Sequence, residues 1–244
     1  MIPVWLRTTC EQNDLRLSDK QLQLLENYAV RLLEWNKKIN LISRRDEDNV
    51  WSRHILHSLG PVFKVDIPEK ARILDLGTGG GLPGVVMKIC RPDLLFTLLD
   101  STQKKINVVK EIVDSLGLDG IDVVWGRAEE LGKRREYAEQ YDVVVARAVG
   151  PLKDLVQWSY PFMKKNAGIK DVSRDDGQHP VRRRINTPAL IAFKGGSVEN
   201  EIEQLRTNPN VGSIATIELT LNGSTQLQDE EKKLVVVECV RSDR

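Results

Sequence analysis

The sequence predicts an α/β fold with a mainly parallel seven-stranded sheet, a terminal antiparallel hairpin and an N-terminal helical extension. Three observations favour this fold. From residue 72 onward, short apolar runs alternate with amphipathic stretches, as in parallel strands covered by helices on both faces. A glycine-rich turn directly follows the first apolar run. The last two apolar runs have no strong helix between them, and the pair Asn222-Gly223 signals a turn there.

The first 65 residues are predicted to form a helical segment ahead of the main domain, which spans residues 66–244. Ser18 can cap a helix that runs to about Lys38, because the apolar residues after it recur with the 3.6-residue helical period. A second helix is predicted over residues 46–59.

The main domain is predicted to carry five parallel strands and a two-stranded hairpin. Helices are expected after Leu82, Thr102, Ala128, Pro151 and Val198. The predicted strands are residues 72–76, 94–99, 121–125, 141–146, 189–193, 216–221 and 234–240.

One stretch, residues 168–188, does not fit the alternation of strands and helices. It is rich in charged residues and has few apolar ones to bury, so it is predicted to be an exposed, mobile insertion loop. The loop contains the adjacent residues Arg182, Arg183 and Arg184. Two interpretations remain open: a solvated insertion without chemistry, or guanidinium contacts to phosphate.

The composition limits the function without fixing it. The 244 residues contain 36 Lys and Arg against 35 Asp and Glu, a formal charge of +1, so any site for a polyanion must be a local patch. Cys10, Cys90 and Cys239 are isolated and indicate reduced, mostly buried thiols rather than disulfides or a metal site. No run reaches membrane-spanning length and no transit-like leader is evident, so a bacterial cytoplasmic protein is expected.

The glycine-rich turn after the first strand predicts a nucleotide-like cofactor. Gly77, Gly79 and Gly81 can adopt positive φ and carry no Cβ, so the backbone can lie against a ligand. Asp75 precedes the first glycine, and a carboxylate there disfavours a pyrophosphate and suits the cationic amino group of S-adenosylmethionine, directly or through water. A dinucleotide remains the alternative, because residues 79–84 also fit G-x-G-x-x-G.

Asp100 supplies the second half of the cofactor pattern. It ends an apolar strand about twenty residues after the glycine turn, where a carboxylate accepts hydrogen bonds from the ribose hydroxyls of a nucleotide. The alternative is an ordinary aspartate at the start of the following helix.

The end of the fourth strand, residues 145–149, points to an intrinsically nucleophilic acceptor. It carries neither the Asn/Asp-Pro-Pro-aromatic turn of exocyclic-amine methyltransferases nor the Pro-Cys nucleophile of cytosine-C5 enzymes. Guanine N7 has an in-plane lone pair and needs neither deprotonation nor covalent activation. Such an enzyme would act mainly by orienting its two substrates.

Five separated segments together resemble the RsmG family, formerly called GidB, which comprises bacterial and plastid methyltransferases that modify guanine N7 of 16S ribosomal RNA. The resemblance covers about residues 20–200, in order. It implies a class I (Rossmann-like) methyltransferase fold, S-adenosylmethionine as cofactor, and 16S ribosomal RNA or the 30S particle as partner. The segments are residues 35–42, 53–59, 74–84, 126–130 and 146–149.

The same resemblance assigns site residues. Gly77 and Leu82 are expected to line the cofactor site, and Ala128 and Glu129 to lie beside the adenine. Arg147 is expected at the junction of cofactor and substrate. Lys194, at the end of the fifth strand, is expected to face the same cleft. Arg147 and Lys194 are therefore the candidate catalytic residues, and no metal ligand is expected. An ion pair for Arg147 and simple solvation for Lys194 are the alternatives.

Two histidines, His54 and His57, lie within the predicted helix over residues 46–59. The family usually has Asp where His57 stands, so a role of that acid cannot be transferred to this chain. His54 is interpreted as a half-buried histidine rather than a proton-transfer group.

RNA contacts are expected from local positive charge. Trp35 and Trp51 fall in apolar helical patterns and are interpreted as core residues rather than base-stacking platforms. If the basic patch is real, RNA binding should weaken steeply with salt. The predicted RNA-binding residues are Lys37, Lys38, Arg44, Arg45, Arg53, Arg182, Arg183 and Arg184.

The resulting hypothesis is a monomeric, cytoplasmic methyltransferase of 16S ribosomal RNA. Three rivals remain at this point: a small-molecule or protein methyltransferase on the same fold, a dinucleotide-dependent oxidoreductase, and a non-catalytic RNA-binding module.

Overall fold

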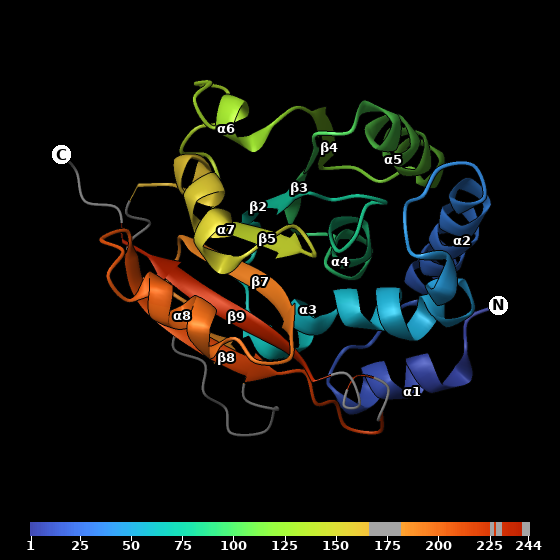
Figure 1. Cartoon of the computed structure of the whole chain (residues 1–244). Helices are drawn as coiled ribbons and strands as arrows, with labels where there is room; N and C mark the ends of the chain where they lie inside the picture. The colour runs from blue at the N-terminus through green and yellow to red at the C-terminus, as the bar shows by residue number, and fades with distance from the viewer. Residues whose placement is uncertain (166–181, 225–226, 228–230, 241–244) are drawn as a thin grey trace.

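The computed structural model describes residues 1–165, 182–224, 227 and 231–240, and within these residues a seven-stranded sheet forms the centre of the molecule (Figure 1). Its strand order is β4-β3-β2-β5-β7-β9-β8, with β9 antiparallel to both neighbours and every other pairing parallel. The predicted α/β fold is therefore confirmed. The strands are β2 (Arg72–Leu76), β3 (Leu95–Asp100), β4 (Ile121–Trp125), β5 (Val143–Arg147), β7 (Ala189–Gly195), β8 (Val211–Glu218) and β9 (Lys232–Cys239).

Helices cover both faces of this sheet. On one face, α4 (Gly84–Cys90) and α5 (Gln103–Leu116) pack into a core with Ile73 and Val143. On the other face, a second core joins α6 (Ala128–Leu131), α7 (Leu152–Ser159) and α8 (Glu199–Leu205) to Leu74 and Val144. Neighbouring residues of β2 and β5 thus belong to opposite cores, which explains why these strands read as continuous apolar runs. A short 3₁₀ turn, η3 (Tyr160–Phe162), follows α7.

The hairpin is confirmed, but its strands begin and end differently from the prediction. β8 starts at Val211, five residues before the predicted start, and ends at Glu218. Asn222 and Gly223 form a turn beyond β8, closed by a bridge between Leu221 and Ser224.

The N-terminal segment is helical as predicted, with one additional helix and one broken helix. α2 (Asp19–Asn36) begins with a capping box between Ser18 and Gln21, in agreement with the predicted cap. The helix α1 (Val4–Gln12) was not predicted. The predicted helix over residues 46–59 is instead a 3₁₀ turn, η1 (Arg44–Asn49), followed by a π-helical turn, η2 (Val50–Leu56), and then by α3 (Gly60–Lys64).

The N-terminal helices share the core of the α4–α5 face rather than forming one of their own. Leu6, Leu25 and Leu32 are fully buried in the same cluster as Ile73 of β2. Two reciprocal hydrogen bonds attach the end of α1 to the hairpin turn: Asn13 Nδ2 donates to the carbonyl of Asn222 at 3.0 Å, and the Asn222 amide donates to Asn13 Oδ1 at 3.1 Å. The domain boundary at residue 65 stays a prediction.

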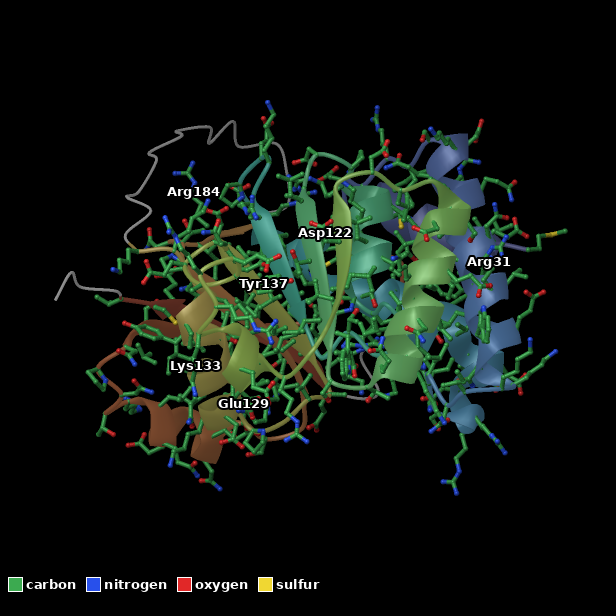
Figure 2. All side chains as sticks on the ribbon, turned by 90° about the horizontal axis from the view of Figure 1, so that it is seen from above. Arg31, Asp122, Glu129, Lys133, Tyr137 and Arg184 are labelled. Atoms are coloured by element: carbon green, nitrogen blue, oxygen red, sulfur yellow. The ribbon has the colours of Figure 1, made fainter. Side chains whose placement is uncertain are left out.

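The predicted insertion loop, residues 168–188, is described only from residue 182 onward; its other residues lie outside the described part. In that part, β6 (Arg183–Arg184) pairs in parallel with β1 (Val65–Asp66). Both short strands precede long parallel strands in the chain, so they lie at the amino-terminal edge of the sheet. Figure 2 shows Arg184 near one end of the strands and Glu129 near the other.

The three cysteines are free and buried, as predicted. Burial raises the pKa of the Cys10 and Cys239 thiols to about 12, which makes both poor nucleophiles. In the described residues, no group of His, Cys, Asp and Glu has the arrangement of a metal site, and no helix is long and apolar enough to cross a membrane.

Candidate cofactor and substrate site

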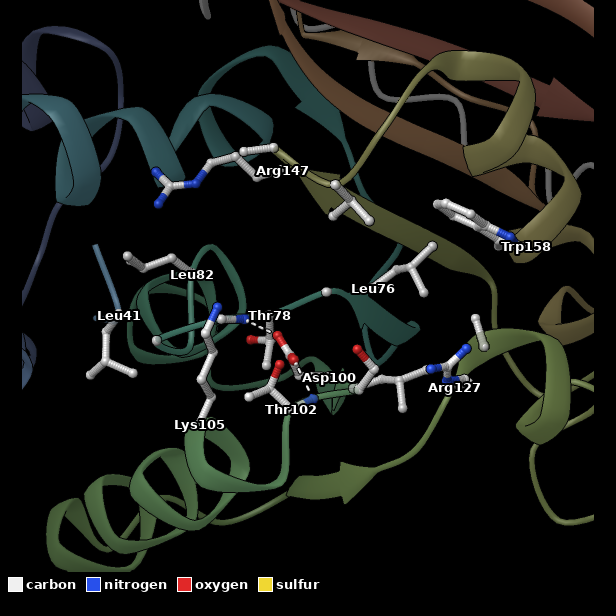
Figure 3. A pocket seen from close by; sticks show the side chains of 18 of the residues that line it. Leu41, Leu76, Thr78, Leu82, Asp100, Thr102, Lys105, Arg127, Arg147 and Trp158 are labelled. Carbon is white, nitrogen blue, oxygen red and sulfur yellow. Dashed lines mark hydrogen bonds between the residues drawn. The ribbon is translucent and has the colours of Figure 1, made fainter. Parts of the chain in front are cut away.

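A cavity of about 550 Å³ opens at the carboxyl ends of β2, β3, β4 and β5 (Figure 3). This is the edge at which open parallel sheets bind ligands. The glycine turn after β2 and the end of β3 form its floor, the start of α6 forms one wall, and Arg147 at the end of β5 lies opposite.

The glycine turn leaves its backbone bare toward the cavity. Gly77 and Gly79 line the cavity and have φ values of +72° and +58°. A Cβ on Gly77 would lie 2.6 Å from Cγ2 of Val149, so no larger residue fits there without displacing its neighbour. Gly81, predicted to bind the cofactor, does not line the cavity. Its φ is +96°, and a Cβ there would collide with Val85.

Asp75 also lies behind the turn rather than on the cavity surface. Its side chain has no exposed area, and its Oδ2 accepts hydrogen bonds from Thr78 Oγ1 at 2.7 Å and from the Gly84 amide at 2.8 Å. Its Oδ1 is buried without a hydrogen-bond partner. Burial raises the pKa of this carboxyl to about 6, although the bonds from Thr78 and Gly84 act in the opposite direction. Asp75 therefore holds the turn against α4, and any action on a ligand must pass through Thr78 or solvent.

Asp100 lines the cavity at the end of β3. Its Oδ2 accepts a hydrogen bond from the Gly79 amide at 2.9 Å, and its Oδ1 accepts one from the Thr102 amide at 2.8 Å (dashed lines in Figure 3). Each oxygen retains a second lone pair. Asp100 thus ties the glycine turn to the start of α5 and can still accept hydrogen bonds from a ligand.

The wall formed by α6 contains both residues predicted beside the adenine. Ala128 is buried and Glu129 is exposed, and both line the cavity together with Arg127. Leu82, also predicted, lines it from the end of the glycine turn.

Arg147 is held by two residues of η2. Its Nη2 lies 3.0 Å from His54 Nδ1, and its Nη1 donates to the carbonyl of Arg53 at 3.5 Å. Burial, the largest cause, lowers the pKa of Arg147, and the nearby Tyr28 and Asp75 act against it. Arg147 lines the large cavity and also a second one.

This second cavity, of about 240 Å³, adjoins the first and includes Lys194. Two contacts fix the position of the Lys194 ammonium group. Its Nζ donates to the Gly150 carbonyl at 3.0 Å and lies 2.7 Å from Oε2 of Glu201. Lys194 lines this second cavity and not the large one, and its predicted role at the cofactor cleft stays a prediction.

His57 and Phe193 form the apolar side of this second cavity. Their rings meet edge to face, with centroids 5.1 Å apart. Burial, followed by the charge of Arg147, lowers the pKa of His57 well below its ordinary value, so this histidine is neutral.

Sequence reasoning missed several cavity residues. Leu41 and Ile42 reach the cavity because Asn36 Oδ1 accepts hydrogen bonds from both of their amides, at 2.8 and 2.9 Å, and thereby turns the chain after α2. Both lie within a segment that carries the family resemblance, which was the available signal. Lys105 and Trp158 line the cavity from α5 and α7, and no motif marked them.

The predicted RNA-binding residues fall into two separate groups. Arg53 belongs to η2, next in sequence to the cavity residue His54, and it is exposed, as are Lys37, Lys38, Arg44 and Arg45. The other group, Arg182, Arg183 and Arg184, lies at the amino-terminal edge of the sheet, away from the cavity. Trp35 and Trp51 are partly buried against the core, as expected.

Comparison with known proteins identifies relatives over most of the chain. The family model of rRNA small subunit methyltransferase G matches residues 21–170. A ribosomal RNA small subunit methyltransferase G of Moorella thermoacetica is 38% identical over 150 residues, which are 62% of each chain. The protein of that name from Lactococcus lactis subsp. cremoris (strain MG1363) is 34% identical over 206 residues, 84% of this chain and 85% of the relative. The chain thus spans less than two thirds of the length of the first relative.

Solved structures support the fold. A predicted O-methyltransferase from Agrobacterium tumefaciens superposes with a TM-score of 0.52 at 14% identity, covering 77% of this chain and 83% of that one. A fibrillarin/Nop5p complex gives a TM-score of 0.52 at 11% identity, covering 78% of this chain and 82% of that one.

Proposed function

Because this chain belongs to the rRNA small subunit methyltransferase G family, we propose that it transfers the methyl group of S-adenosylmethionine to guanine N7 of 16S ribosomal RNA. The observation that carries the proposal is the large cavity at the carboxyl edge of the sheet, with a bare glycine turn and a carboxylate in its floor.

The residues of this cavity fit S-adenosylmethionine. Val149 occupies the space that a Cβ on Gly77 would need, so only glycine fits at this position. A ligand in the cavity therefore contacts the Gly77 backbone and no side chain of this residue. Asp100 keeps free lone pairs for two ribose hydroxyls, and Leu76, Leu82 and Ala128 offer apolar surface for a ring. Above its pKa of about 6, the Asp75 carboxylate adds negative charge behind the turn, which favours a cationic ligand over a pyrophosphate.

We assign cofactor binding to Gly77, Gly79, Leu82, Asp100, Ala128, Glu129 and Arg147. Asp75 and Gly81 are proposed to act from behind the cavity surface, without contacting the cofactor. Asp75 would act through its negative charge and its hydrogen bond with Thr78. Gly81 would act by adopting the positive φ that the turn requires. When bound, the cofactor supplies an electrophilic methyl group: the N7 lone pair forms the new bond while the methyl–sulfur bond breaks and its electron pair stays on sulfur.

The second cavity is proposed to receive the acceptor base. Arg147 and Ala148 line both cavities, so the two cavities adjoin at these residues. Arg147 and Lys194 carry only hydrogen-bond donors, which suit the O6 acceptor of guanine. The chain needs no general base, because N7 is already unprotonated. Its task is to hold N7 in line with the methyl group, which can lower a barrier by roughly 7 to 11 kcal/mol.

RNA binding is proposed for the basic surface beside the cavity, formed by Lys37, Lys38, Arg44, Arg45 and Arg53. Arg182, Arg183 and Arg184 are proposed to contact a separate stretch of RNA, because they lie at the other edge of the sheet. We further propose that the protein acts as a monomer in the cytoplasm, which sedimentation and cell fractionation would test.

The decisive experiment incubates the protein with methyl-labelled S-adenosylmethionine and either 30S particles or free 16S ribosomal RNA, and then maps the label. Label on guanine N7 at one position is expected. Label on protein, on a small molecule or on another base atom would refute the substrate. The control for the cofactor compares the equilibrium binding of S-adenosylmethionine with that of NAD. We expect the protein to bind S-adenosylmethionine and not NAD.

A further inference from the structure

A chain of three polar side chains connects the N-terminal segment to Arg147. His54 of η2 presents Nδ1 to Nη2 of Arg147 at 3.0 Å, and its Nε2 lies 3.5 Å from Oδ2 of Asp46 in η1. The carbonyl of Arg53 accepts from Nη1 of Arg147 on the same side. Two residues of η2 therefore contact the Arg147 guanidinium, and Asp46 of η1 lies on the far side of the His54 ring.

We propose that His54 is a positioning residue that orients Arg147 for methyl transfer by accepting a hydrogen bond at Nδ1 while its proton resides on Nε2. This inference rests on the proposed function, since Arg147 is the residue that borders both the cofactor cavity and the acceptor cavity.

The chemistry of the pair fixes the protonation of His54. A guanidinium has five N–H donors and no acceptor, so a histidine nitrogen 3.0 Å from it must offer a lone pair. Nδ1 is therefore unprotonated, and the proton of the neutral ring sits on Nε2, which lies 3.5 Å from Oδ2 of Asp46 without a hydrogen bond to it.

The surroundings keep the ring neutral. His54 is only 8% exposed, and its pKa is lowered to about 4, first by burial and then by the charge of Arg147. Asp46 raises this pKa and Arg53 lowers it further. His57, also neutral, is the remaining titratable neighbour. At neutral pH His54 is thus an acceptor and not a competing cation.

Holding Arg147 at two points defines the plane of its guanidinium. Nη1 and Nη2 each direct one donor at η2, to the Arg53 carbonyl and to His54. The remaining N–H donors then have fixed directions relative to the two cavities. Without His54, the longer contact at 3.5 Å would be the remaining hydrogen bond of this side chain within the described residues, and the side chain would gain rotamer freedom.

Three substitutions separate this role from a merely structural one. In His54→Asn, the amide oxygen lies as many bonds from Cβ as the Nδ1 of histidine and can accept the same hydrogen bond. In His54→Gln the oxygen is one bond further out, and in His54→Leu the acceptor is lost with similar bulk. Thermal unfolding of each variant verifies that it folds.

Single-turnover methylation with saturating S-adenosylmethionine is the first readout. His54→Leu and His54→Gln are expected to slow the step about 10- to 100-fold, whereas His54→Asn should stay within about threefold of the wild type. Equal rates in all four proteins would overturn the proposal. A His54→Asn variant as slow as His54→Leu would overturn it as well, because the acceptor would then not be what matters.

The second readout does not depend on turnover. The chain has three histidines, so ¹⁵N spectra of the imidazoles are simple to assign with the His54→Asn variant. A neutral ring with the proton on Nε2 is expected for His54 at pH 7, and Arg147→Ala should raise its pKa by removing a nearby positive charge. A proton on Nδ1 would refute the proposal even if methylation of 16S RNA is confirmed. A correct tautomer without any RNA methylation would instead refute the proposed function.

Discussion

Replacing Asp75 by asparagine should change how the stability of the protein depends on pH. Burial raises the pKa of this carboxyl from 3.8 to about 6 in the folded protein. Ionisation of Asp75 is therefore less favourable in the folded protein than in the unfolded chain, so it lowers the free energy of unfolding. The penalty is absent well below pH 3.8, develops between about pH 3.8 and about pH 6, and levels off at about 3 kcal/mol above the folded-state pKa.

Asparagine lacks this penalty because it does not ionise. Its Oδ1 can accept from Thr78 and Gly84 as Oδ2 of Asp75 does, and its Nδ2 would take the place of the oxygen that has no partner. The new amide adds an offset that does not change with pH. The difference in unfolding free energy between Asp75→Asn and wild type should thus increase by about 2 kcal/mol from about pH 4.5 to about pH 7, in favour of the variant.

Urea denaturation at the two pH values measures this difference directly. Asp122→Asn, on the exposed side of β4, is the matched control for the loss of one carboxylate. A difference between Asp75→Asn and wild type that is the same at both pH values would refute the reasoning. The variant should also bind S-adenosylmethionine at least about tenfold more weakly, because the cationic ligand loses a charge behind the turn, and calorimetry measures this.

Three further predictions concern other parts of the site. Gly77→Ala should cost about 1–3 kcal/mol in thermal unfolding and abolish cofactor binding in calorimetry, because a Cβ would lie 2.6 Å from Val149 at a φ of +72°; normal binding would contradict the turn's role. Lys194→Met should keep the affinity for S-adenosylmethionine and slow single-turnover methylation at least about tenfold, since Lys194 lines only the second cavity; a loss of cofactor affinity would place it elsewhere. The double variant Arg183→Ser/Arg184→Ser should leave cofactor affinity unchanged and reduce the salt slope of RNA binding by about 1–2, and an unchanged slope would argue against phosphate contacts there.

Much of the sheet could be predicted because its strands are short apolar runs, and the central strands β2, β5 and β7 are buried almost throughout. The bounds of β2 and β4 agree with the predicted ranges, and β3, β5 and β7 begin within two residues of theirs. Apolar runs between turn residues carry this information locally. The edge strand β8 has mixed exposure along its length, and its start was accordingly predicted too late.

Features that depend on distant contacts were missed. α1 has few buried residues, and its attachment to Asn222 is invisible in local sequence. Residues 46–59 have the periodicity of one helix, yet the chain divides them between a 3₁₀ and a π-helical turn. π-turns often occur at functional sites, and this one carries His54 to Arg147.

Side-chain direction was the weakest part of the site prediction. The residue type of Asp75 suggested a ligand, but its place on β2 turns it toward α4. For Arg182, Arg183 and Arg184 the topology did contain the answer, since a segment that enters a parallel strand lies at the amino-terminal edge of the sheet, away from bound ligands.

The pairing of Asn13 with Asn222 has a consequence for biosynthesis. The two residues stand 209 positions apart, so α1 leaves the ribosome long before its partner is made. During translation this helix lacks both hydrogen bonds to the hairpin turn until Asn222 has been made. Final closure of the molecule is therefore among the last events of its synthesis.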